Sequence, residues 1–192
     1  MAGKTLAIFD FDGTLVRGDT LWTFLAALRG PVTAATLWLA AVATAPFTAT
    51  FHIDKRTAVK QQWVLFAAKG VPLARAEDAA ARIRPRWLFP QLAALQQHAA
   101  DDATIIIATG ALDICMRHMT KTLPVTAILD TPLLHDNGVL TGLMQGNAVR
   151  GEKAARVRDY IAAHGPFDKI IGYGNLPHDR AMLDLCDEQY VI

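Results

Sequence analysis

Short apolar runs alternate with helical segments over the second half of the chain, and this alternation limits the fold more than any other feature of the 192 residues. We predict apolar strands at 5–9, 104–108, 125–129, 169–173 and 189–192, with helices between the last four. Strands and helices that alternate through short links form a doubly wound, mainly parallel α/β sheet. Ligands bind such a sheet beyond the carboxyl ends of its strands.

The segment between the first strand and residue 90 has a different, helical pattern. Asp19 can cap a helix whose apolar residues follow three-four spacing, and Gly30 with the proline after it ends that helix. Helical patterns continue to about residue 90 without a convincing strand. We therefore expect an all-helical cap, residues 17–89, inserted into an α/β core formed by residues 1–16 and 90–192.

Two short apolar runs, 132–134 and 139–143, flank the dipeptide Asn137-Gly138. Asn-Gly between such runs is typical of a β-hairpin with a two-residue turn. We predict a hairpin here, before a helix at 152–164. The strand at 189–192 would lie at a sheet edge without a covering helix, so we expect further chain or a partner to protect it.

The stretch from Gly30 to Phe51 contains no charged residue and is about as long as the roughly 20 residues that span a bilayer. Five threonines and two prolines make it only mildly apolar. We expect a buried or interface-facing helical hairpin of the cap, interrupted by Pro46 near its end, and no transmembrane span. Contact with a membrane surface is the alternative.

Charge and cysteine content exclude several functional classes. Nineteen basic and eighteen acidic residues give a net charge of +1, which provides no general attraction to nucleic acid. Phosphate recognition must therefore be local.

Cys115 and Cys186 are far apart and are expected to be buried thiols, and the histidines lack the paired spacing of a zinc site. Without an apolar leader at the N-terminus, we expect a cytoplasmic protein.

Two carboxylates follow the first predicted strand. Asp10 and Asp12 are separated by one residue, and Gly13 after them permits an unusual backbone turn. Carboxylates at the end of a buried strand need compensation, and magnesium supplies it because it prefers carboxylate, water and phosphate oxygens. For an isolated pair, a simple Asx-type turn is the alternative.

Four segments in order resemble the motifs of the haloacid dehalogenase superfamily. They are Asp10-Phe11-Asp12-Gly13-Thr14, the strand leading to Thr109-Gly110, Gly151-Glu152-Lys153, and 172–179. The resemblance covers nearly the whole chain. The helical insertion and the hairpin are most similar to the branch that includes phosphoserine phosphatase and phosphatidylglycerophosphatase C. The resemblance implies a magnesium-dependent phosphatase that acts on a small-molecule or lipid phosphate ester.

The resemblance also implies catalytic roles. Asp10 would attack phosphorus and form an aspartyl phosphate, and Asp12 would be the general acid and base, a task that a raised pKa would help. The Thr109 hydroxyl, the backbone amides of the turn at Gly110 and Lys153 would bind the phosphoryl oxygens.

The implied magnesium ligands are Asp10, Asp12, Asn175 and Asp179. Members of the family usually carry aspartate at the position of Asn175, so the ligand charge is lower by one. An amide carbonyl still suits magnesium, and we expect weaker binding that persists. An impaired metal site is the alternative.

The cap is expected to select the substrate. Asp19 stands where phosphoserine phosphatases carry a glutamate that recognises an amino group, and Lys55 or Arg56 could bind a carboxylate. Apolar cap residues such as Trp38 and Phe47 either favour a lipidic leaving group or pack the cap. Transfer of the phosphoryl group to an acceptor alcohol, and a binding or regulatory protein without turnover, are the alternatives to hydrolysis.

Overall fold

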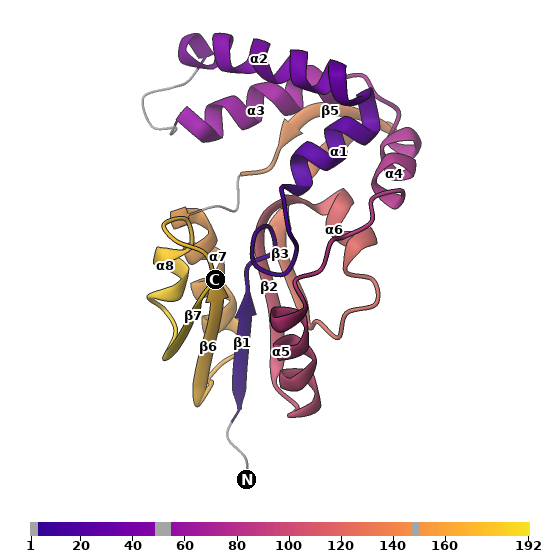
Figure 1. The fold of residues 1–192 in the computed structure, drawn as a ribbon. Coiled ribbons are helices and arrows are strands. Elements are labelled where there is room, and N and C mark those ends of the chain that lie inside the picture. Colours follow the sequence, from indigo (N-terminus) through magenta and orange to yellow (C-terminus); the bar gives the residue numbers. More distant parts are fainter. Residues whose placement is uncertain (1–3, 49–54, 147–149) are drawn as a thin grey trace.

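The computed structural model describes residues 4–48, 55–146 and 150–192. Its centre is a five-stranded parallel sheet in the order β3-β2-β1-β6-β7 (Figure 1). The strands are β1 (Thr5–Phe9), β2 (Thr104–Leu112), β3 (Ala127–Thr131), β6 (Lys169–Gly174) and β7 (Glu188–Val191). The chain runs outward from β1 to one edge, returns beside β1 and runs to the other edge. The predicted doubly wound α/β fold is confirmed.

Helices cover both faces of the sheet. One face packs against α5 (Phe89–Ala100) and α6 (Asp113–Met119), and the other against α7 (Arg150–His164) and α8 (Arg180–Leu183). Side chains of the central strand β1 alternate between these layers, with Ala7 and Phe9 on the first and Leu6 and Ile8 on the second. All four are fully buried, which explains why β1 is an uninterrupted apolar run.

A helical layer lies beyond the carboxyl ends of the strands (Figure 1). It contains α1 (Thr20–Arg29), α2 (Pro31–Thr48), α3 (Lys55–Ala68) and α4 (Leu73–Ala81). As predicted, Asp19 caps α1, since its Oδ1 accepts a hydrogen bond of 2.9 Å from the backbone amide of Trp22. Gly30 ends α1 with φ +85°. The Trp63 indole of α3 donates to the Ala34 carbonyl of α2 over 3.0 Å and joins the two helices.

Helix α2 buries small residues and exposes large apolar ones. Ala34 and Ala41 are fully buried, whereas Leu39 is 61% and Phe47 90% exposed. Within the described residues no single helix has the length and apolar character needed to cross a membrane. Helices α1 and α2 meet these requirements only together, and the chain bends by 119° between them.

Several predicted boundaries were wrong, including that of β3, which was predicted at 125–129 and is observed at Ala127–Thr131. Pro46 lies inside α2, which continues to Thr48, because a proline this close to the helix end removes only one backbone hydrogen bond. Strand β2 does not stop at residue 108 but reaches Leu112, because its pairing with β3 shifts register after Ala108 and resumes at Leu112 and Thr131. The last helix, which the sequence pattern predicts over 180–186, is shorter in the structure, where α8 ends at Leu183. Of the two predicted buried thiols, Cys115 is buried but Cys186 is partly exposed.

The predicted hairpin is present as β4 (Leu133–Asp136) and β5 (Val139–Met144). Asn137 and Gly138 both have positive φ, +47° and +77°, as a two-residue turn of this kind requires. The hairpin packs on the helical layer, where the Gly70 amide donates to Leu140 O over 2.9 Å and the Leu140 amide to Val71 O over 2.8 Å. A hairpin from the C-terminal half of the chain therefore completes the helical layer.

Gly142→Ala should loosen this hairpin from α3. A Cβ at Gly142 would lie 3.0 Å from Lys69 Cβ and 3.1 Å from Leu65 Cα, and the residue has φ +78°. Gly138→Ala is a matched control, because its φ is +77° but no atom lies within 4 Å of the added Cβ. We expect about 1–2 kcal/mol of destabilisation from φ in both variants and about 1–3 kcal/mol more in Gly142→Ala, measured by urea unfolding. Equal losses would contradict close packing on α3.

Candidate active site

The carboxyl ends of β1, β2 and β6 border a cavity of about 270 Å³, which residues of the helical layer also line. The predicted catalytic, phosphate-binding and metal residues all contribute to its wall, as do Asp19 and Arg56 of the cap, but Lys55 does not. The lining residues are Asp10, Asp12, Asp19, Leu21, Arg56, Thr57, Lys60, Thr109, Gly110, Ala111, Lys153, Asn175, His178 and Asp179. Most are polar or charged, and the large apolar residues of α2 are not among them.

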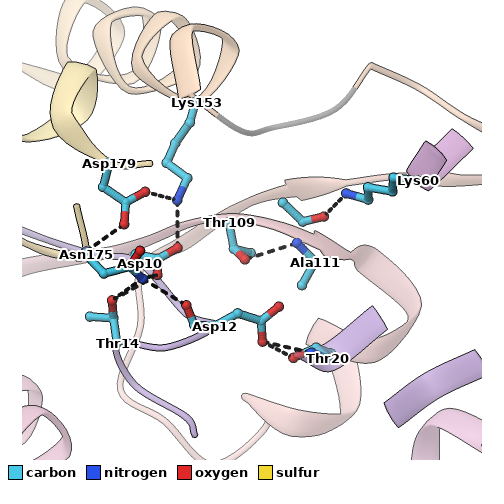
Figure 2. A network of polar contacts seen from close by, with 11 residues as sticks. Asp10, Asp12, Thr14, Thr20, Lys60, Thr109, Ala111, Lys153, Asn175 and Asp179 are labelled. Atoms are coloured by element: carbon cyan, nitrogen blue, oxygen red, sulfur yellow. Dashed lines mark hydrogen bonds and ion pairs between the residues drawn. The ribbon is translucent and has the colours of Figure 1, made fainter. Parts of the chain in front are cut away.

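Asp10 directly follows β1 and is buried. Its backbone amide donates to Tyr173 O over 2.9 Å, which holds it level with the end of β6. Its carboxylate accepts from Lys153 Nζ over 2.6 Å and from the Thr14 hydroxyl over 2.9 Å (Figure 2). Burial raises the pKa of Asp10, and the positive charge of Lys153 opposes that rise. The buried carboxylate is therefore oriented by a cation and a hydroxyl.

Lys153 lies in the first turns of α7 and is buried. Its ammonium is 2.6 Å from Asp10 Oδ1 and 2.6 Å from Asp179 Oδ1. Burial alone would lower the pKa of Lys153, but the two carboxylates outweigh it and raise that pKa. The ammonium therefore stays charged and links the end of β1 to the loop after β6.

The Asp12 carboxylate is directed away from Asp10, toward the start of α1. Its Oδ1 accepts from the Thr20 backbone amide over 3.1 Å and also from the Thr20 hydroxyl (Figure 2). Burial raises the pKa of Asp12 to about 7, although these hydrogen bonds oppose the shift. A carboxyl group with such a pKa can both donate and accept a proton near neutral pH.

Asn175 and Asp179 follow β6. The Asn175 side-chain amide donates to Asp12 O over 3.1 Å and to Asp10 Oδ2 over 3.3 Å (Figure 2). Asp179 Oδ2 accepts from the Asn175 backbone amide over 2.8 Å, while its Oδ1 binds Lys153. Both oxygens of Asp179, the fourth predicted magnesium ligand, are therefore engaged within the protein, and a direct bond from Asp179 to the ion would replace one of these contacts.

The donor set at Asn175 fits a magnesium ion. The Asp10 carboxylate and the Asp12 carbonyl both accept hydrogen bonds from the Asn175 NH2 group. Rotation of the Asn175 amide by about 180° would turn its oxygen toward them, and three oxygen ligands would then face one ion. Among the described residues, no three His, Cys, Asp or Glu side chains are grouped as a metal site. Asp12 was predicted as a magnesium ligand. Its carboxylate is bonded to Thr20 and its backbone carbonyl faces Asn175, so the carbonyl is the oxygen through which Asp12 would bind the ion.

Thr109 lies within β2, three residues before its end at Leu112, and is buried. The expected strand-to-helix turn is absent, since β2 continues through Gly110 and Ala111. The Ala111 amide, predicted to bind phosphate, donates over 3.0 Å to Thr109 Oγ1 (Figure 2). The register shift at this point leaves Thr109 and Gly110 facing the cavity.

The cap contributes three charged side chains to the cavity. Asp19 and Arg56 were predicted here, and Arg56 Nη1 lies 2.9 Å from His178 Nε2 at the end of the fourth motif. The third, Lys60, was missed, and its Nζ lies 2.5 Å from the carbonyl of Gly110. The sequence contained one indication that Lys60 belongs to the site: it follows Arg56 by four residues and therefore lies on the same face of the helix. Phe51, another predicted cap residue, is outside the described residues.

Comparison with known proteins identifies the family. Residues 7–184 match the model of the haloacid dehalogenase-like hydrolases. The chain belongs to this family. The resemblance inferred from four motifs is thus confirmed, and the cavity described above lies within the matched part of this hydrolase.

Several known proteins are similar to this hydrolase. Protein CicA of Caulobacter vibrioides is 28% identical over 194 aligned residues, covering 96% of this chain and 84% of that protein. A protein of unknown function from Bordetella pertussis Tohama I superposes with a TM-score of 0.75 at 20% identity, covering 98% and 89% of the two chains. A substrate-bound phosphoserine phosphatase gives 0.72 at 16% identity, covering 100% and 87%. The structural likeness shows a shared, phosphoserine phosphatase-like fold.

Proposed function

We propose that this hydrolase is a magnesium-dependent phosphatase that cleaves a phosphate monoester through an aspartyl phosphate on Asp10. The observation that carries the proposal is the buried carboxylate of Asp10, held 2.6 Å from Lys153 Nζ in a cavity that also contains Asp12. In this proposal residues 1–16 and 90–192 are the catalytic core, and residues 17–89 are the cap. The phosphatase name of a structural neighbour supports the same activity.

The proposed reaction has two displacements. In the first, a carboxylate oxygen of Asp10 bonds to phosphorus, the ester P–O bond breaks, and protonated Asp12 gives its proton to the leaving alkoxide. In the second, water bonds to phosphorus, Asp12 takes the water proton, and the bond between Asp10 and phosphorus breaks to release phosphate. The pKa of about 7 for Asp12 supports both of its tasks near neutral pH.

Charge on the phosphoryl oxygens needs fixed positive groups and hydrogen-bond donors. Lys153 supplies an ammonium beside Asp10, and the Thr109 hydroxyl supplies a donor from β2. Magnesium would be held by Asp10, the Asp12 carbonyl and Asn175, and when bound it would add positive charge beside the phosphoryl group. The charged lining of the cavity favours a small polar ester over a lipid.

Release of inorganic phosphate from p-nitrophenyl phosphate tests the proposal. We expect release with magnesium and without any acceptor alcohol, and loss of release when a chelator replaces magnesium. Transfer that requires an added alcohol would show a phosphotransferase and overturn hydrolysis. Absence of turnover on a panel of phosphate esters, together with retained binding of orthovanadate or phosphate, would indicate a binding protein and overturn both.

Asn175→Asp should change the response to magnesium. In chelator, the new carboxylate loses the amide bonds to Asp12 O and Asp10 Oδ2 and repels Asp10, so we expect Tm to fall by roughly 4–8 °C. Magnesium should then raise the Tm of the variant more than that of the wild type, because the ligand charge increases by one. Thermal unfolding with and without magnesium measures both effects.

Asn137→Asp is the matched control, since Asn137 is exposed in the hairpin turn. It should leave both Tm values unchanged. If Asn175→Asp matches the wild type in chelator, and magnesium stabilises neither protein, the magnesium assignment is wrong.

A further inference from the structure

A lysine of the cap enters the cavity without a role in the reaction described above. Lys60 lies in α3, and its Nζ is 2.5 Å from the backbone carbonyl of Gly110 in β2. Figure 2 shows the side chain reaching across to this end of β2, beside Thr109 and Ala111. The contact spans the space between the helical layer and the sheet, where a leaving group attached to the phosphoryl group would extend.

The groups around Lys60 are those that would otherwise attract a substrate ammonium. Gly110 offers a carbonyl oxygen, and Asp19 and Asp12 offer carboxylates in the same cavity wall. Burial lowers the pKa of Lys60 to about 8, and the charges of Asp19 and Asp12 oppose that fall. The side chain therefore carries its positive charge near neutral pH. The Lys60 ammonium thus occupies the position beside the Gly110 carbonyl that would suit a substrate ammonium.

The second cap cation strengthens this arrangement. Arg56 lines the same cavity, one helical turn before Lys60 on α3, and contacts His178 over 2.9 Å. Lys153, by contrast, is committed to Asp10 and Asp179. The cap side of the cavity thus carries two cations and the carboxylate of Asp19, and it presents a net positive charge to the leaving group of the ester.

We infer that Lys60 is a specificity-determining residue that excludes leaving groups with an ammonium beside the ester and admits leaving groups with hydroxyl and carboxylate groups there. The inference rests on the proposed phosphatase activity and names its substrate class as phosphate monoesters of oxygen-rich, non-amino alcohols. An ammonium in the substrate would lie beside that of Lys60 and lose the carbonyl partner that Lys60 occupies. A hydroxyl in its place meets no such repulsion, and a nearby carboxylate gains attraction.

Two substrates isolate the effect, because 3-phosphoglycerate differs from O-phosphoserine only by a hydroxyl in place of the ammonium. We expect the wild type to favour 3-phosphoglycerate in kcat/KM by roughly 10- to 100-fold. Lys60→Met should reduce this ratio several-fold or more, mainly through KM, and Lys60→Arg should retain it because the charge persists. Lys121→Met, on an exposed turn, is the matched control and should leave the ratio unchanged.

The outcomes separate this inference from the proposed function. If the wild type hydrolyses p-nitrophenyl phosphate but handles both substrates equally, or prefers O-phosphoserine, the role of Lys60 is overturned while the phosphatase activity stands. A ratio that Lys60→Met leaves intact overturns the role as well. If the wild type hydrolyses none of the three esters, the proposed phosphatase activity is contradicted, and the role of Lys60 in selecting its substrate is contradicted with it. If Lys60→Met does not fold, the ratio of kcat/KM for the two substrates in the wild type and in Lys60→Arg still tests the inference. A preference for 3-phosphoglycerate in both proteins supports it, and its absence in the wild type contradicts it.

Discussion

Asp10→Asn is expected to lower kcat for phosphate release by roughly 10³-fold or more, because a neutral amide cannot act as the carboxylate nucleophile. The substitution keeps the shape of a buried side chain that bonds to Lys153 and Thr14. The cavity should therefore persist while the reaction stops. Steady-state release of phosphate from p-nitrophenyl phosphate with saturating magnesium measures the loss.

Asp159→Asn makes the same chemical change on the exposed face of α7 and should keep full activity. Circular dichroism spectra of both variants should match that of the wild type. Retention of more than a tenth of the wild-type kcat in well-folded Asp10→Asn would remove Asp10 from the role of nucleophile.

Lys153→Met should impair both catalysis and folding. Loss of the ammonium removes the charge that faces the phosphoryl oxygens, and we expect kcat to fall by roughly 10²- to 10³-fold. In the wild type, the carboxylates of Asp10 and Asp179 each lie 2.6 Å from Lys153 Nζ. The substitution leaves both carboxylates buried without this shared partner. Breaking a buried pair in this way costs about 3–5 kcal/mol, which urea unfolding should detect.

Lys169→Met is the matched control for that variant. Lys169 pairs with Glu188 over 2.7 Å, but both side chains are nearly half exposed, so solvent already stabilises them. We expect no loss of activity and only a small change in stability. Equal destabilisation by the two substitutions would contradict the buried, bridging position of Lys153.

Local patterns in the chain were sufficient to predict most elements of the fold. Strand β1 was predicted with its observed bounds, since Thr5 and four successive apolar residues precede an acidic loop. The Asn137-Gly138 turn was predicted because few other dipeptides accept two positive φ values. Asp19 was predicted as a cap, because its side chain can bond the orphan amides of α1. These features depend on neighbours in the sequence and are readable from it.

The catalytic residues were predicted from motifs, but their bonds were not. Asp10 and Lys153 are 143 positions apart, and only the neighbouring positions of β1 and α7 bring them to 2.6 Å. The direction of the Asp12 carboxylate depends on Thr20 at the start of α1, which determines that its carbonyl faces Asn175. The extension of β2 depends on its partner β3, which no pattern within residues 104–112 could indicate.

The sequence by itself determined the parallel α/β core, the helical insertion, the hairpin and the chemical types of the site residues, because apolar periodicity, turn residues and motif order are local properties. Tertiary structure alone decided that the hairpin packs on α3 and that Lys60 enters the cavity to meet Gly110, 50 positions away. These contacts join elements that are distant in the sequence, so they form only when the helical layer packs over the carboxyl ends of the strands. Their free energy comes from that packing and not from any local sequence pattern.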